Sequence, residues 1–129
     1  MLYLTIKTDQ SESEIGLMNP ILIKSFNWIA NRTLSHTLNS KIKDLLDNSK
    51  FTLDQLNGII FFSGPGSFTS LRIGASVANT LAYSLKIPII AVSGDDWKEL
   101  GIKKLNQGKN DFIVVPEYGS EVRITKARK

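Results

Sequence analysis

A glycine-rich turn, set between an apolar run and a long stretch with almost no charge, leaves this chain few folds. Residues 58–63 read GIIFFS, residues 64–66 read GPG, and residues 71–85 contain one charged residue, Arg72. A short apolar run suits a strand buried on both faces, and glycine permits a sharp reversal. An alanine-rich stretch without proline favours a helix. The pattern therefore predicts a strand, a tight turn and a helix.

The residues ahead of this turn predict three further strands. Apolar and polar residues alternate over residues 2–8, 13–17 and 21–30, which is the period of a strand with one buried face. A change of phase at Ser25 is typical of a β-bulge in the third strand. Short polar turns separate the three segments, so we expect an antiparallel meander.

Helical and strand patterns alternate in the rest of the chain. Apolar residues between 38 and 49 recur at helical spacing, with Ser35 or Thr37 as the N-cap. The long helix is expected to end before Pro88, because proline cannot continue a helix. The other predicted elements are a helical turn capped by Thr52, a buried strand over residues 89–93, a helix over residues 97–105, and a hairpin formed by residues 112–115 and 121–127.

The predicted order of elements indicates a mixed α/β fold of the ribonuclease-H type. A strand, a helix and a second strand at this spacing form a parallel crossover, which follows the three-strand meander. The chain has 129 residues, which suits one core. It has no cysteine, which excludes disulfides and thiolate zinc sites. No apolar run approaches the roughly 20 residues of a membrane span, so a cytoplasmic protein without membrane contact is expected.

The glycine turn has two interpretations. Backbone N–H groups at the start of a helix attract anions, but this loop has no Walker lysine and no third glycine of a dinucleotide loop. The other interpretation is structural, with the glycines serving only the chain reversal. We favour the structural interpretation for Gly64, Pro65, Gly66, Ser67 and Gly74.

Nothing in the sequence predicts a catalytic residue, a metal or a cofactor. His36 is the only histidine, and it lies in a polar stretch. The first strand carries Lys7 where metal-dependent ribonuclease-H folds place a carboxylate, so a metal pair is not expected.

The long helix predicts a surface for a partner protein. Its residues are apolar almost all round, and a helix of this kind must be covered on more than one side. The alternative is a helix at the centre of a compact monomer. The residues predicted to meet the partner are Leu38 on the first helix and Leu71, Arg72, Ala75, Ala78, Asn79, Ala82 and Tyr83 on the long helix.

One family signature matches the turn and the helix that follows it. Residues 64–74, GPGSFTSLRIG, closely resemble the GPGSFTGLRIG signature of the TsaB (YeaZ) family, a component of tRNA threonylcarbamoyladenosine biosynthesis. The resemblance is good over residues 32–93. Ser70 replaces a glycine of the signature, and Lys7 stands where the family usually has an aspartate.

The resemblance implies an actin-like, Hsp70-like (ASKHA) fold and a role as a scaffold. Residues 1–107 would form the first domain, and residues 108–129 a remnant hairpin of a truncated second domain. The family implies a non-catalytic subunit that pairs through its two helices with a metal-containing TsaD-type subunit, which modifies tRNAs reading ANN codons. A TsaE-type ATPase would join the assembly, and this chain would contact tRNA only indirectly. Separately, because the last predicted strand could leave an open edge, we expect a homodimer through the long helix when the partner is absent.

Two other functions remain open from the sequence. One is a metallopeptidase-like enzyme, since relatives have carried a peptidase label. The other is a basic module that contacts RNA, because the chain has a net charge of +4. The residues predicted for such RNA contact are Arg123, Lys126, Arg128 and Lys129.

Overall fold

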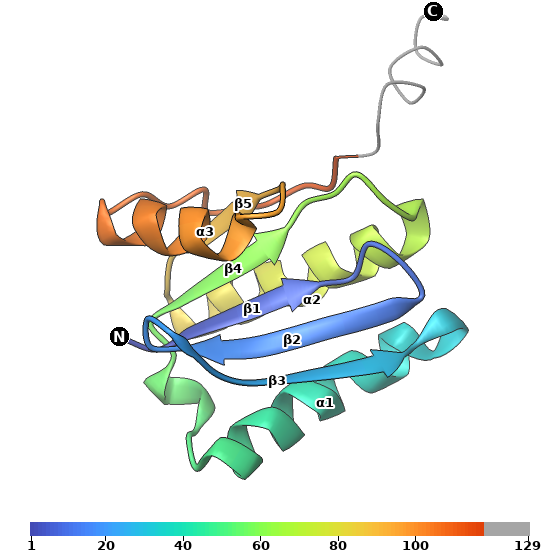
Figure 1. Cartoon of the computed structure of the whole chain (residues 1–129), viewed down its shortest axis with the longest axis horizontal. Coiled ribbons are helices and arrows are strands. Elements are labelled where there is room, and N and C mark those ends of the chain that lie inside the picture. The colour runs from blue at the N-terminus through green and yellow to red at the C-terminus, as the bar shows by residue number, and fades with distance from the viewer. Residues whose placement is uncertain (118–129) are drawn as a thin grey trace, which may run out of the picture.

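The fold is built on one five-stranded sheet with helices on both faces. A computed structural model describes residues 1–117 of the chain (Figure 1). The strands in these residues are β1 (Tyr3–Lys7), β2 (Glu12–Met18), β3 (Leu22–Ile29), β4 (Gly58–Phe62) and β5 (Ile89–Val92). The helices are α1 (Leu34–Ser49), α2 (Phe68–Leu85) and α3 (Trp97–Asn106), with short 3-10 helices η1 (Asn31–Thr33) and η2 (Leu53–Gln55).

The strand order is β3-β2-β1-β4-β5. The first three strands pair antiparallel, and β4 and β5 add in parallel to β1. The predicted meander and crossover are therefore confirmed. The register between β2 and β3 shifts where Leu17 pairs with Lys24 and Met18 with Leu22. The extra residue is thus Ile23, so a bulge is present in β3 but not at Ser25, which pairs normally with Gly16.

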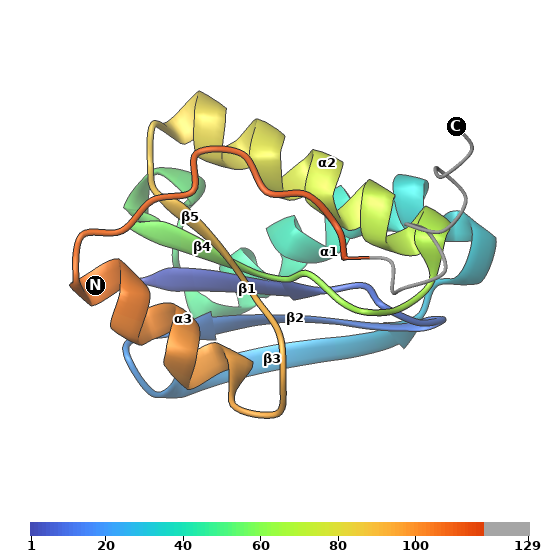
Figure 2. The same ribbon diagram turned by 90° about the horizontal axis from the view of Figure 1, so that it is seen from above.

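Two layers of helix enclose the sheet (Figure 2). Helices α1 and α2 lie on one face, where Leu4, Ile6 and Phe61 are fully buried. Helix α3 lies on the other face, against Ile60 and Phe62. Successive residues of a strand point to opposite faces, so a central strand covered on both sides must be apolar at every position. This requirement explains the unbroken apolar run of β4.

The start of α1 differs from the prediction. The helix begins at Leu34 directly after η1, with Thr33 at its N-cap, so Ser35 and Thr37 lie inside the helix and the predicted caps are wrong. The hydroxyl of Thr37 instead accepts a hydrogen bond of 3.1 Å from the indole N–H of Trp28. A contact with the preceding strand β3 therefore uses the side chain that the local pattern assigned to capping.

The end of α2 and the cap of η2 agree with the prediction. Helix α2 ends at Leu85, before Pro88, and Lys86 follows in the left-handed conformation with φ 58°. Thr52 forms a capping box at η2 together with Gln55. None of the helices among residues 1–117 is long and apolar enough to cross a membrane.

Residues 110–117, which we call the edge segment, lie beside β5 and form no strand. The predicted strand at 112–115 is therefore wrong. Side chains take the place of a strand partner: the N–H of Ile89 donates to Asn110 Oδ1 over 3.1 Å, and the N–H of Ala91 donates to Asp111 Oδ2 over 2.9 Å. The backbone N–H of Asp111 completes the set by donating to the carbonyl of Ile89 over 2.8 Å.

The edge segment is also held by α2. The side chain of Asn79 pairs with both backbone groups of Val114, accepting from its N–H over 2.8 Å and donating to its carbonyl over 3.0 Å. Val114 itself is buried in the core. The predicted second hairpin arm at 121–127 lies outside the described residues, so the predicted division at residue 107 stays a prediction.

Candidate functional site

The glycine turn packs directly against the end of the first hairpin. A Cβ atom at Gly66 would lie 2.5 Å from the carbonyl oxygen of Asp9, so no larger residue fits there. The N–H of Ser67 donates to the same carbonyl over 2.7 Å. Gly64 has φ +116°, a conformation that favours glycine. The turn thus fastens the start of α2 to the segment after β1.

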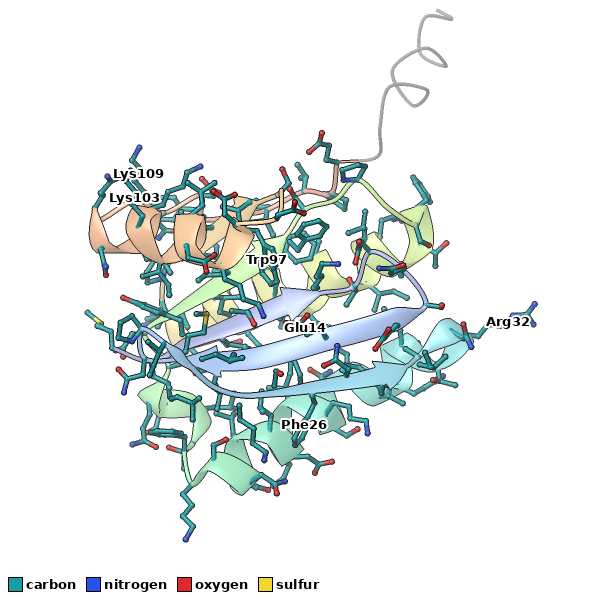
Figure 3. All side chains as sticks on the ribbon, viewed as in Figure 1. Glu14, Phe26, Arg32, Trp97, Lys103 and Lys109 are labelled. Atoms are coloured by element: carbon teal, nitrogen blue, oxygen red, sulfur yellow. The ribbon has the colours of Figure 1, made fainter. Side chains whose placement is uncertain are left out.

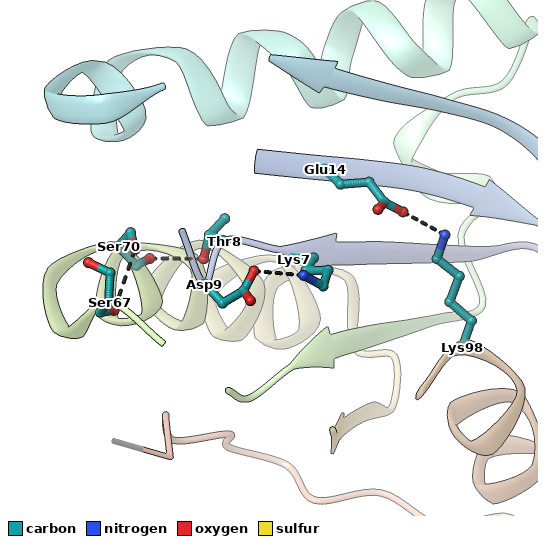
Figure 4. Close-up of polar contacts among 7 residues, drawn as sticks. All are labelled: Lys7, Thr8, Asp9, Glu14, Ser67, Ser70 and Lys98. Atoms are coloured by element: carbon teal, nitrogen blue, oxygen red, sulfur yellow. Dashed lines mark hydrogen bonds and ion pairs between the residues drawn. The ribbon is translucent and has the colours of Figure 1, made fainter. Parts of the chain in front are cut away.

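The first turn of α2 is fastened to the same segment by a side chain (Figure 4). The hydroxyl of Thr8 donates to the carbonyl of Ser70 over 2.9 Å. A Cβ atom at Gly74 would collide with the Thr8 hydroxyl and would lie 3.2 Å from the Phe61 ring. Glycine at this position therefore lets the helix approach β1 and β4 closely.

The polar groups beside the turn are engaged with one another. Lys7 forms an ion pair of 2.8 Å with Asp9, and its ammonium lies 4.6 Å from the centre of the Phe62 ring. The Ser67 N–H, which anion binding at the turn would need, already donates to Asp9. This geometry supports the structural interpretation of the turn over the anion-binding one.

Most of the residues predicted to meet a partner lie on the inner side of the helices. Leu38, Leu71 and Ala78 are fully buried in the core. Glutamate at Ala78 would place a carboxylate among apolar side chains, so it would disturb the fold rather than report on a partner. The members of the predicted set that this chain buries itself are Leu38, Leu71, Ala75, Ala78 and Ala82.

The remaining three predicted residues have different surroundings. Tyr83 is 86% exposed, and Arg72 is exposed with its guanidinium 5.1 Å from the centre of the Phe68 ring. Asn79 is half-buried because its side chain binds the edge segment. Only Arg72 and Tyr83 therefore present most of their surface outward.

The outward side of α2 carries one charged residue. Arg72, Ser76, Thr80 and Tyr83 are exposed at spacings of four, four and three, which places them on one face of a helix. The Thr80 hydroxyl donates to the Ser76 carbonyl over 2.8 Å, so it needs no outside partner. Ile73 is half-buried beside this row. The prediction missed Ser76 and Thr80, although their helical spacing from Arg72 could have found them.

An apolar groove of about 400 Å³ adjoins this surface, between α1, η2 and α2. Leu46 and Leu81 line it from the two long helices, and Lys43 and Asp47 of α1 also border it. Leu53, which lines it from η2, is 42% exposed. We call this groove and the row from Arg72 to Tyr83 the helix surface. Such a groove can receive apolar side chains of another protein.

The described part of the chain offers no metal site. Within residues 1–117 no group of three or more histidine, cysteine, aspartate or glutamate side chains is placed to hold a metal ion. His36 lies on the exposed side of α1.

The sheet order and the helices on both faces define the ribonuclease-H-like, ASKHA class of α/β proteins. The family model "TsaD: tRNA N6-adenosine threonylcarbamoyltransferase" matches residues 28–97, more than half of the chain. A solved structure described as YeaZ from Pseudomonas aeruginosa matches with a TM-score of 0.68 and 30% identity, over 71% of this chain and 43% of that one.

Curated relatives agree with this assignment. The tRNA threonylcarbamoyladenosine biosynthesis protein TsaB of Buchnera aphidicola is 54% identical over 40% of this chain and 24% of its own length. TsaB of Haemophilus influenzae is 32% identical over 74% of this chain. The chain therefore belongs to the family of this model, within its TsaB (YeaZ) group. The match covers 41% of the Haemophilus protein, so the chain spans less than half the length of these relatives.

Proposed function

We propose that this chain is a non-catalytic subunit of the machinery that makes threonylcarbamoyladenosine in tRNAs decoding ANN codons. It pairs with a TsaD-type catalytic subunit, to which tRNA binds. A TsaE-type ATPase joins the assembly. The names of the relatives support this pathway, since they are described as tRNA threonylcarbamoyladenosine biosynthesis proteins.

The helix surface is the observation that carries the pairing. A helix side that stays in water normally carries charged residues, yet α2 has Arg72 as its only charge over 18 residues. Ser76 and Thr80 are small, so another helix can approach closely along this row. The apolar groove beside the row would bury further surface against a partner. This combination is typical of a protein interface with an apolar centre.

The proposed non-catalytic role is supported by Lys7, the last residue of β1. Lys7 is positively charged and is already paired with Asp9 over 2.8 Å. Threonylcarbamoyl transfer is therefore assigned to the partner subunit. Without that partner, the helix surface pairs two copies of this chain.

Co-purification with a TsaD-type subunit tests the pairing. Thr80→Glu places a carboxylate at the centre of the exposed row, and we expect at least tenfold weaker pairing with the melting temperature unchanged, because Thr80 is exposed. Gln10→Glu adds the same charge at an exposed position in the turn between β1 and β2, away from the exposed row of α2, and serves as the control. The readouts are the dissociation constant and the tRNA modification by the reconstituted assembly.

Two outcomes would contradict the proposal. The first is no detectable pairing of the unaltered chain with the TsaD-type subunit. The second is equal pairing of the Thr80→Glu and unaltered chains, which would move the interface away from the helix surface. Turnover of the transfer reaction by this chain alone would contradict its non-catalytic role.

A further inference from the structure

Lysines that are scattered in the sequence gather at one edge of the folded chain. Helices α2 and α3 both end at the edge where the parallel strands begin (Figure 1). Lys86 is the C-cap of α2. Lys103 and Lys104 lie in the last turn of α3, and Lys109 follows that helix. We call these four residues the lysine edge.

Backbone contacts hold the lysine edge together. The N–H of Lys109 donates to the carbonyl of Lys104 over 3.0 Å. Lys86 and Asn110 line the same hollow, which brings the end of α2 next to Lys109. Figure 3 shows Lys103 and Lys109 at one end of the molecule and Arg32 at the other. The backbone hydrogen bond thus places Lys109 beside the last turn of α3.

None of the ion pairs among residues 1–117 engages a residue of the lysine edge. Within residues 1–117 the three ion pairs engage Lys7, Lys43 and Lys98. Lys98, on the same helix as Lys103 and Lys104, is held by Glu14 over 2.5 Å. Lys103, Lys109 and Lys86 are exposed, and Lys104 is partly exposed.

Helix ends explain only part of this arrangement. A lysine in the last turn of a helix is stabilised by the partial negative charge of the helix end, which accounts for Lys103 and Lys104. Lys86, the C-cap of α2, is stabilised in the same way, whereas Lys109 lies beyond the end of α3. The four lysines come from three segments that lie at one end of the sheet, and like charges gathered at one end produce a positive potential there.

We propose that the lysine edge binds the phosphate backbone of RNA. The inference rests on the proposed function, because it takes tRNA as the anion that the assembly must hold. The compact ammonium group of a lysine can pair with any phosphate along an RNA backbone. Helix α3 lies on the opposite face of the sheet from α2 (Figure 2), so three of the four lysines are away from the helix surface and RNA can bind while the partner is bound.

Direct binding of unmodified tRNA by the full chain, measured by fluorescence anisotropy over a series of KCl concentrations, tests the proposal. The triple variant Lys103→Gln, Lys104→Gln, Lys109→Gln should bind at least tenfold more weakly near 50 mM salt. The slope of log affinity against log salt should fall by about three, one for each phosphate that the variant no longer neutralises. The triple Lys→Arg variant keeps the charges and should retain binding.

A control of equal charge separates a local site from the effect of net charge. Lys24→Gln, Arg32→Gln, Lys41→Gln also removes three positive charges, from β3, η1 and α1. Its salt slope should fall by less than one. Equal losses in the two variants would overturn the proposal, and so would unchanged binding in the lysine-edge variant.

Two further measurements separate this proposal from its alternatives. Vesicles containing phosphatidylserine report on an anionic membrane. Loss of vesicle binding with tRNA binding unchanged would assign the lysine edge to a membrane and overturn the proposal. Co-purification with the TsaD-type subunit should be unaffected by the lysine-edge variant. If the unaltered chain failed to pair with the TsaD-type subunit, the proposed function would be contradicted. If only the lysine-edge variant lost pairing, the lysine edge would contact the protein partner, and the RNA-binding proposal would be overturned.

Discussion

Helices α1 and α2 cover the same face of the sheet, yet they are built differently. The buried side of α1 consists of leucine and isoleucine, as at Leu38 and Ile42. The buried side of α2 is mostly alanine and glycine, as at Ala78 and Gly74. Large side chains fill the wider space over the outer strands β2 and β3, whereas small ones let α2 lie close to the central strands.

The outer sides of the two helices differ as well. Helix α1 exposes charged residues, including an ion pair between Lys43 and Asp47 at 3.0 Å. Helix α2 exposes small polar residues, Phe68 and Tyr83, with Arg72 as its one charge. A helix side that stays in water normally carries charged residues, so the single charge on the outer side of α2 supports the proposed pairing there, while the charged pair of α1 borders the adjoining groove. The comparison teaches that each helix has two sides to assess. The side facing the sheet determines packing within the chain, and the outward side determines whether a partner can bind.

The largest effect is expected where α1 fills space. Leu38→Ala removes a fully buried side chain and should lower the free energy of unfolding by about 3 kcal/mol, because a cavity forms in the core. Asn39→Ala, on the exposed side of the same helix, is the control and should cost far less. Urea denaturation followed by circular dichroism measures both. A similar small loss in both variants would show that α1 is not packed as described.

A smaller effect is expected where α2 leaves no space. Gly74→Ala raises helix propensity by about 1 kcal/mol, but the added methyl group collides with the Thr8 hydroxyl. Overpacking typically costs about 1 to 3 kcal/mol, so we expect a net loss of about 1 kcal/mol. The same change in a Thr8→Ala background should cost less, which a double-mutant cycle measures. A net gain in stability on Gly74→Ala alone would show that α2 does not approach β1 closely.

The smallest effect is expected on the outer side of α1. The hydrogen bond and charge of Asp47 raise the pKa of Lys43 above its ordinary value of 10.5. Because folding raises the pKa of Lys43, the pair stabilises the folded state fully below the ordinary pKa of lysine. This stabilisation is lost as the pH rises through the folded pKa. Because the pair is exposed, Lys43→Gln should leave the melting temperature at pH 7 unchanged within error. A clear loss of melting temperature at pH 7 that disappears once the pH rises through the folded pKa would show a stronger pair than the exposure allows.

Local patterns in the sequence predicted most of the strands and helices. The alternation of residues 2–8 and the apolar run before the glycine turn depend only on which faces of a strand are buried, so they predicted β1 and β4. The N-cap of α1 could not be predicted, because Thr37 is engaged by Trp28 from β3. The edge segment could not be predicted either, since the strand-like residues at 112–115 lie beside an edge that Asn110 and Asp111 have already closed.

The candidate site was less accessible to sequence reasoning than the fold. The uncharged character of α2 is a property of composition and was visible directly. Which side of that helix faces the sheet depends on where Thr8 and the strands lie. Helical periodicity alone does not show whether the alanine side or the serine–threonine side is free to meet a partner. Five of the eight predicted contact residues were therefore assigned to a surface that the chain covers itself.

The polar closure of β5 bears on how these molecules behave when they are crowded together. An unpaired strand edge is a template on which a neighbouring molecule can add a strand and begin to aggregate. Asn110 and Asp111 occupy the donors of Ile89 and Ala91 that such a strand would need. Two polar side chains thus protect one edge of the sheet against intermolecular β-pairing, and the outer edge of β3 is the route by which strand-mediated aggregation of the described fold would proceed.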